Sequence, residues 1–165
     1  MPPLRRAMLL LVLLLPAKLA HASLLEPQAD AGFGRAVAVS GETMVVGAPT
    51  CRGANGQINE GAVWVYTRDG AGWALQQRIA NPRSVGDNFG TSVAIAGDVL
   101  AVGAPGDSVG FNTGIVYVFA RSGASWALQQ RLIAGSSVDM AGWSVALSGD
   151  TLAVGGFAPL VTVFV

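Results

Sequence analysis

The chain has very little of the chemistry that most enzymes use. Its 165 residues contain one cysteine, Cys51, one histidine, His21, and one lysine, Lys18. A single cysteine excludes a disulfide within the chain. The thiol of Cys51 is either free or bridged to another molecule, or Cys51 is a small loop residue without a role. Only 12% of the residues are charged and 52% are hydrophobic, which is the opposite of a disordered composition.

The histidine and the lysine both lie in an N-terminal segment that has the features of a secretory signal peptide. Arg5 and Arg6 give it a positive start, Met8–Leu15 is an apolar run too short to span a bilayer, and residues 20–22 read Ala-His-Ala. We therefore expect cleavage after residue 22 and a mature protein that is secreted, extracellular, periplasmic or at the cell surface. The alternative is an uncleaved membrane anchor.

Cleavage at this position changes the available chemistry. It removes three of the ten basic residues and none of the ten acidic ones, so about 143 residues remain with a net charge of about −3. No imidazole and no lysine amine remain, which excludes Ser-His-Asp and Cys-His catalysis, Schiff bases and histidine-ligated metals. Without a basic patch, neither nucleic acid nor an anionic membrane is an expected partner. We expect no membrane span in the mature chain and no catalytic, cofactor-binding or metal-binding residues.

What the sequence does contain is an internal repeat. Residues 33–79 and 89–132 align along their length, and the segments Trp73–Arg78 and Trp126–Arg131 are identical. A third copy begins at Ala141. A repeat of this length predicts stacked units of the same fold. The expected units are about 30–82, about 83–135 and an incomplete unit at 136–165.

Each full unit contains four short runs with alternating residues, which predict strands. Val93 and Ile95 share one face of a run, and small residues occupy the other, so we expect sheets that are covered on both faces. Gly41-Glu42, Gly97-Asp98 and Gly149-Asp150 suit type II′ hairpin turns. No helical pattern follows residue 22. The sequence therefore predicts an all-β fold, a β-propeller with about 2.5 to 3 four-stranded blades, partial or open.

Two pairs of short motifs carry a family resemblance. They are Phe33-Gly34 with Gly47-Ala48-Pro49, and Phe89-Gly90 with Gly103-Ala104-Pro105. They resemble the FG-GAP repeats of the integrin α-subunit N-terminal β-propeller. The third copy departs from the pattern, with Ala141-Gly142 and Gly155-Gly156-Phe157. We expect the motif residues to have structural roles, with Phe33 and Phe89 as apolar plugs between blades and the glycine after each, Gly34 and Gly90, where backbones approach closely.

In that family the loop after the GAP motif can hold calcium through an Asp-x-Asp-x-Asp-Gly pattern. Here the loop at 50–60 has one carboxylate, Glu60, and the loop at 106–113 has only Asp107 with Asn112. Calcium takes six to eight oxygen ligands, several of them carboxylates. The metal role of the family is therefore not expected here.

Three interpretations of function follow. The first is an integrin α-like cell-adhesion or binding module for an unknown extracellular protein or glycan. Its contacts would lie in the two loops, at Arg52, Asn55, Asn59, Glu60, Asp107, Phe111 and Asn112. The second is a carboxylate-dependent propeller hydrolase. Its candidates are Asp87 with Asp139 and Asp98 with Asp150, but these recur with the repeat, as turn residues do and a single active site does not. The third is a fragment of a larger propeller protein.

The repeat also predicts packing and assembly. We expect Trp73 and Trp126, which open the fourth strand of their units, to be mostly buried between blades. Three blades are fewer than the four to eight of typical propellers. We therefore expect an open arc with an unpaired edge at Val161–Val165, and self-association through the open blade edges.

Overall fold

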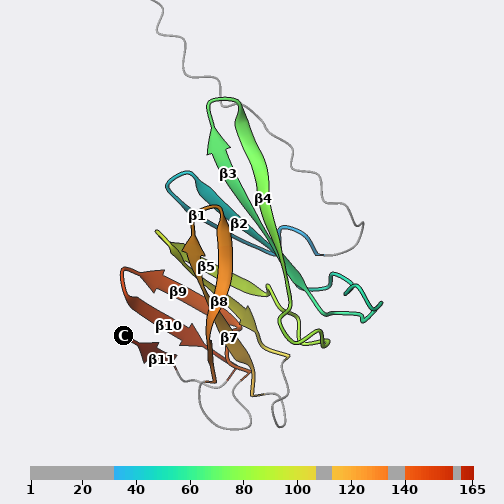
Figure 1. Ribbon diagram of the computed structural model, residues 1–165. Helices are drawn as coiled ribbons and strands as arrows, with labels where there is room; N and C mark the ends of the chain where they lie inside the picture. The colour runs from blue at the N-terminus through green and yellow to red at the C-terminus, as the bar shows by residue number, and fades with distance from the viewer. Residues whose placement is uncertain (1–31, 107–112, 134–139, 158–160) are drawn as a thin grey trace, which may run out of the picture.

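The computed structural model describes residues 32–106, 113–133, 140–157 and 161–165 (Figure 1). Within these ranges the chain consists of strands and connecting loops. The strands are β1 (Ala36–Ser40), β2 (Thr43–Ala48), β3 (Ala62–Asp69), β4 (Gly72–Ala80), β5 (Ser92–Ala96), β6 (Val99–Ala104), β7 (Ile115–Ser122), β8 (Ser125–Leu132), β9 (Ser144–Ser148), β10 (Thr151–Gly155) and β11 (Val161–Phe164). The described ranges hold no helix able to cross a membrane. The expected signal peptide lies outside them.

The strands form three separate antiparallel sheets. Sheet 1 has the order β1-β2-β3-β4, sheet 2 the order β5-β6-β7-β8, and sheet 3 the order β9-β10-β11. The innermost strand of sheet 2, β5, contacts β1 on one side and β9 on the other, so the sheets follow one another as successive blades (Figure 1). The predicted all-β, partial and open propeller is confirmed. Among the described strands, β11 pairs only with β10, which leaves the expected edge at the end of sheet 3.

The hairpins form where glycine permits a left-handed backbone. Gly41, Gly97 and Gly149 have φ values of 56°, 55° and 57°, and none of the acidic residues that follow them has a positive φ. A positive φ at the first turn residue alone is the property of a type II′ turn, as predicted. Sheets 1 and 2 also share a register shift, at Val65/Tyr66 and at Val118/Phe119. A bulge at the same place gives both sheets the same bend.

Each sheet has an upstream face, toward the sheet before it in the chain, and a downstream face, toward the next. Between sheets 1 and 2, the upstream residues of sheet 2 bury against the downstream residues of sheet 1. Upstream Val93, Ile95, Leu100, Tyr117, Phe119 and Trp126 cluster with downstream Val45, Val63, Val65 and Ile79. Sheets 2 and 3 repeat this arrangement with Ala101, Val116 and Leu132 against Leu152 and Val154. Both faces of sheet 2 are therefore covered, as the apolar alternation predicted.

The two tryptophans at the start of β4 and β8 differ in burial. Trp126 is buried between sheets 1 and 2, where its indole Nε1 donates to Gln76 Oε1 at 3.1 Å. Trp73 is only partly buried and packs on the upstream face of sheet 1 with Trp64 and Tyr66. The expectation that both lie between blades is correct for Trp126 and wrong for Trp73, because no described sheet lies upstream of sheet 1.

Candidate functional site

The FG and GAP motifs meet within each sheet at the start of its innermost strand. The amide of Gly34 donates to the carbonyl of Gly47 at 3.1 Å, and Gly90 donates to Gly103 at 3.0 Å. Sheet 3 keeps the bond from Gly142 to Gly155, at 3.1 Å, although its motif residues differ. Each pair extends the first two strands of its sheet by one more hydrogen bond.

The same glycines also join one sheet to the next. A Cβ placed on Gly47 would lie 2.1 Å from the carbonyl oxygen of Gly90, and one on Gly103 would lie 2.0 Å from that of Gly142. No side chain fits at such distances, since real Cβ atoms essentially never lie within 3.0 Å of another atom. Isolated parallel bridges reinforce the joints, between Gly61 and Phe89 and between Gly114 and Ala141. The expectation of close backbone approach is confirmed for Gly90, where a Cβ would lie 2.8 Å from the Ala62 carbonyl oxygen, and is wrong for Gly34, where nothing lies within 4 Å.

The aromatic motif residues are packing residues. Phe89 is fully buried and presents its edge to Tyr117 and Phe119, with ring centroids 5.3 and 6.1 Å apart. It belongs to the cluster between sheets 1 and 2, where a plug was expected. Phe33 is partly buried and stands edge-on to Trp64, 5.5 Å away in its own sheet. Phe33 thus does not lie between two described sheets.

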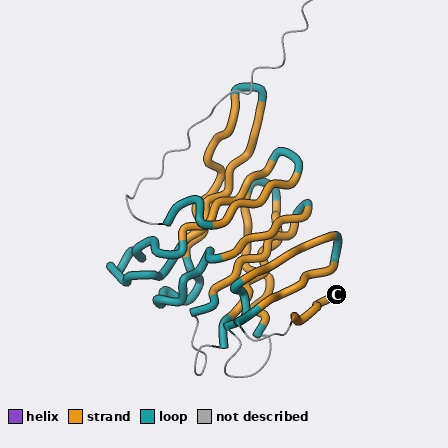
Figure 2. Tube along the Cα trace, turned by 180° about the vertical axis from the view of Figure 1, so that it is seen from behind, coloured by secondary structure: helices purple, strands orange, loops and turns teal. Residues whose placement is uncertain are grey.

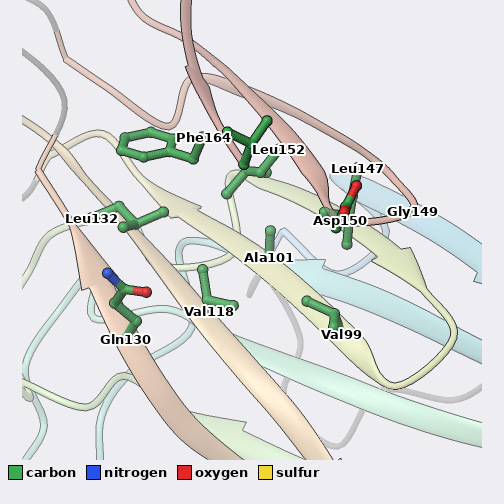
Figure 3. A pocket seen from close by; sticks show the side chains of 11 residues that line it. Val99, Ala101, Val118, Gln130, Leu132, Leu147, Gly149, Asp150, Leu152 and Phe164 are labelled. Atoms are coloured by element: carbon green, nitrogen blue, oxygen red, sulfur yellow. The ribbon is translucent and has the colours of Figure 1, made fainter.

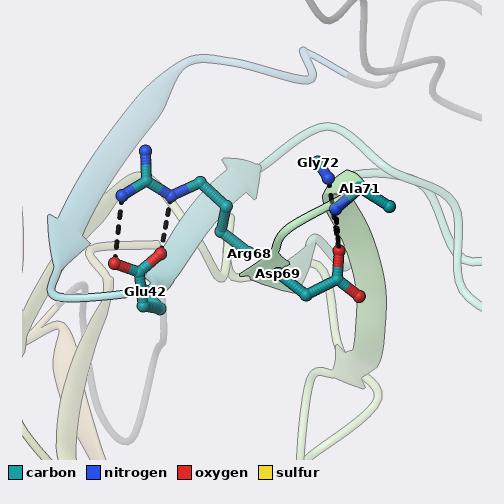
Figure 4. Close-up of polar contacts among 5 residues, drawn as sticks. All are labelled: Glu42, Arg68, Asp69, Ala71 and Gly72. Carbon is teal, nitrogen blue, oxygen red and sulfur yellow. Dashed lines mark hydrogen bonds and ion pairs between the residues drawn. The ribbon is translucent and has the colours of Figure 1, made fainter.

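The acidic residues of the hairpins form ion pairs with the ends of the third strands. The Glu42 carboxylate accepts hydrogen bonds from Arg68 Nε at 2.6 Å and from Arg68 Nη2 at 3.0 Å (Figure 4). The hydrogen bond from Arg68 lowers the pKa of Glu42 below its ordinary value. Asp98 takes the same place in sheet 2 and pairs with Arg121 at 3.2 Å. In both sheets the arginine closes the hairpin onto the third strand.

The carboxylate of Asp87 is also held by hydrogen bonds from the surrounding loop. This carboxylate is buried, and Oδ1 accepts hydrogen bonds from Asn81 Nδ2 at 2.5 Å and from the amide of Phe89 at 3.2 Å. Asn81 also donates to the carbonyls of Glu60 and Val85. These bonds hold the loop that leads into β5. Its repeat counterpart, Asp139, lies outside the described residues.

The candidate loops are only partly as expected. Arg52, Asn55 and Asn59 are exposed in the loop at 50–60. Glu60 is buried instead, with 3% of its surface accessible, because its carboxylate packs against Gly53. Figure 2 shows this loop beside the loop that leads into β5, and the amide of Asn88 bonds to the carbonyl of Asn59 at 2.9 Å. Asp107, Phe111 and Asn112 lie outside the described residues.

A groove of about 230 Å³ lies at the motif end of the three sheets and was not foreseen. Arg35, Thr91 and Trp143 line it, together with Pro49, Pro105 and Met140. Arg35, Thr91 and Trp143 are the residues that directly follow the FG glycine, or its counterpart, in the three copies. Aligning the copies would have revealed the signal, because this position alone changes from basic to hydroxyl to aromatic within a constant frame.

The backbone beside the groove takes an uncommon conformation. Asn88 and Met140, which precede the FG position in the second and third copies, have φ values of 59° and 41°. A left-handed conformation is unfavourable for a methionine and persists only where its surroundings impose it. Trp143 is 45% exposed, and its ring meets that of the exposed Phe157 edge-on at 6.1 Å. Among the described residues no group of histidine, cysteine or carboxylate side chains could hold a metal.

A second cavity, of about 300 Å³, lies between sheets 2 and 3 (Figure 3). Its walls are mostly aliphatic, with Leu132 from sheet 2 and Leu152 and Phe164 from sheet 3, and Gln130 also lines it. At the matching place between sheets 1 and 2, Gln77 binds the backbone of Trp126, which donates to Oε1 at 2.7 Å and accepts from Nε2 at 3.1 Å. The cavity is thus the place where a fourth strand of sheet 3 would pack.

The chain matches a known protein family. The family model of the FG-GAP repeat matches residues 25–66 and 73–119, together more than half of the chain. The second match begins at Trp73, in β4, and ends at Phe119, in β7. The family unit therefore runs from the last strand of one sheet through the third strand of the next. No curated protein matches the chain.

Proposed function

Because this chain belongs to the FG-GAP repeat family, we propose that it is a secreted or cell-surface binding module that holds an extracellular protein or glycan ligand in the groove at Arg35, Thr91 and Trp143. Binding, without a catalytic step, is the activity that these side chains suit. Integrin-like adhesion is the form of binding that the family resemblance favours, and export follows from the signal peptide expected at residues 1–22.

One observation carries the proposal. The three residues at the same repeat position differ in chemistry and line one groove, whereas the glycine before each keeps the same backbone hydrogen bond in every copy. The constant positions build the sheets, so the variable position is free to serve recognition. An exposed indole offers a stacking surface for a sugar ring or an aliphatic side chain, and Arg35 adds hydrogen-bond donors.

The carboxylates do not favour the hydrolase alternative. Asp98 is engaged by Arg121, and Asp87 is buried and bonded to the loop around it. A retaining or inverting hydrolase needs two carboxyl groups facing one substrate. The remaining alternative, a piece of a larger propeller protein, is compatible with the same groove.

The proposal is tested by binding. The secreted protein is screened against immobilised glycans and extracellular matrix proteins, and the affinity for any ligand is measured by calorimetry. We expect Trp143→Ala and Arg35→Ala each to weaken binding at least tenfold. Arg131→Ala removes an exposed arginine of β8, outside the groove, and serves as the matched control. Binding that both groove variants leave intact, or no binding in either screen, would overturn the proposal.

A further inference from the structure

The upstream face of sheet 1 exposes residues that are buried at the same position in sheet 2. Val37 and Val39 correspond to Val93 and Ile95 by their distance from the FG glycine. Val37 and Val39 are 55% and 57% exposed, but Val93 and Ile95 are 9% and 8% exposed. The difference arises because sheet 1 covers the pair in sheet 2. By contrast, Trp64, on the same face in β3, is 2% exposed.

The downstream face of sheet 3 shows the complementary exposure. Ala146 is exposed and Ala153 partly buried, whereas their counterparts in sheet 2, Ala94 and Ala101, are buried. Inside the chain, the small residues Ala94 and Ala101 of sheet 2 lie where the next sheet packs, as β9 lies against β5 and β6. Sheet 3 therefore offers the kind of surface onto which Val37 and Val39 fit.

Sheets 3 and 1 each also carry one side of such a backbone joint, and neither side contacts another described sheet. Gly155 corresponds to Gly47 and Gly103, but a Cβ placed on it would meet nothing closer than 3.6 Å. Gly34 corresponds to Gly90 and Gly142, and a Cβ there would meet nothing within 4 Å. At the working joint between sheets 2 and 3, Ser92 Oγ donates to the carbonyl of Gly142 at 2.7 Å. Ser144 holds the position of Ser92 in sheet 3.

We propose that these two half-joints meet in a second copy of this chain, so that Gly155 and Ser144 of one copy pack against the Gly34 carbonyl of the next. The partner is another copy because each chain carries both halves of a joint that it already forms twice internally. Two copies joined head to tail bring six sheets into one ring, within the range of about four to eight blades found in propellers. A heterologous contact of this kind forms a ring when its rotation closes.

Gly155→Ala is the decisive variant. Within one chain the methyl has space, and the φ of Gly155 is not positive, so the fold is retained. In the assembly the methyl would meet the Gly34 carbonyl of the next copy, as it would at Gly47 and Gly103. Size exclusion with light scattering should give twice the chain mass for the secreted protein and the mass of one chain for Gly155→Ala.

A second pair of variants tests the other half of the contact. Val39→Asp should also give single chains, because it places a charge in the apolar part of the contact. Ile58→Asp, at a residue that is 55% exposed in the loop after β2, should remain a pair and serves as the matched control. A single-chain mass for the unaltered protein at all concentrations overturns the proposal. So do assemblies that grow without limit, or a pair that survives both Gly155→Ala and Val39→Asp.

Discussion

Substituting Gly103 by alanine tests the joint between sheets 2 and 3 directly. The added methyl would lie 2.0 Å from the carbonyl oxygen of Gly142 and 2.3 Å from Ser92 Oγ. The φ of Gly103 is not positive, so alanine can take the same backbone conformation. Any destabilisation therefore arises from the contact, which is relieved only if the two sheets move apart by at least about 1 Å.

The magnitude follows from two terms. Overpacking in a closely packed region costs about 1–3 kcal/mol. Displacing the serine hydroxyl from the Gly142 carbonyl costs about 1 kcal/mol more. We expect the free energy of unfolding to fall by about 2–4 kcal/mol, and Tm to fall by about 6–15 °C in a domain of this size.

Urea unfolding followed by tryptophan fluorescence measures this effect, with Tm from calorimetry as a second readout. Gly70→Ala is the control, because a Cβ on Gly70 meets no atom within 4 Å and its φ is not positive. If Gly103→Ala lies within about 0.5 kcal/mol of Gly70→Ala, which is the usual range for a neutral surface change, the close approach of the two backbones is refuted.

Four further outcomes are expected. Amino-terminal sequencing of secreted material should begin at Ser23; recovery of the intact chain in the membrane fraction would refute cleavage. Trp126→Ala should cost about 3–5 kcal/mol of stability and Trp73→Ala clearly less, and equal losses in urea titrations would contradict their different burial. Because Arg68 lowers the pKa of Glu42, this pair stabilises the fold at neutral pH and loses that effect in acid below about pH 4.3. The difference in the free energy of unfolding between the parent and Glu42→Gln should therefore become smaller in acid. Added salt should also reduce this difference. Millimolar calcium should leave Tm unchanged, and a rise reversed by a chelator would indicate a site.

The sheets were predictable from the sequence because the copies repeat every feature that builds a strand. The alternation at Val93 and Ile95, the turn glycine at Gly97 and the acidic residue after it recur at fixed distances, so each copy supports the interpretation of the others. The roles of Gly90 and Gly103 were also within reach, because glycine in a strand pattern signals close backbone approach.

The groove was not predictable in the same way, because an alignment of the copies marks the variable position but does not show that its three residues lie together in space. Arg35, Thr91 and Trp143 share no chemistry, and only the curvature of three successive sheets brings them together. The burial of Glu60 was missed for a related reason. Its carboxylate is enclosed by the path of its own loop, at Gly53, and loop paths have no periodic pattern that a sequence could reveal.

The joints of paired glycines also bear on how such a protein can change over generations. Two backbones in direct contact have no rotamers to adjust, so the angle between neighbouring sheets is set by the main chain and is insensitive to the loops. The connection from β2 to β3 is already longer than that from β6 to β7, yet both joints have nearly the same spacing. Loops and groove residues can therefore diverge freely while the curvature stays constant.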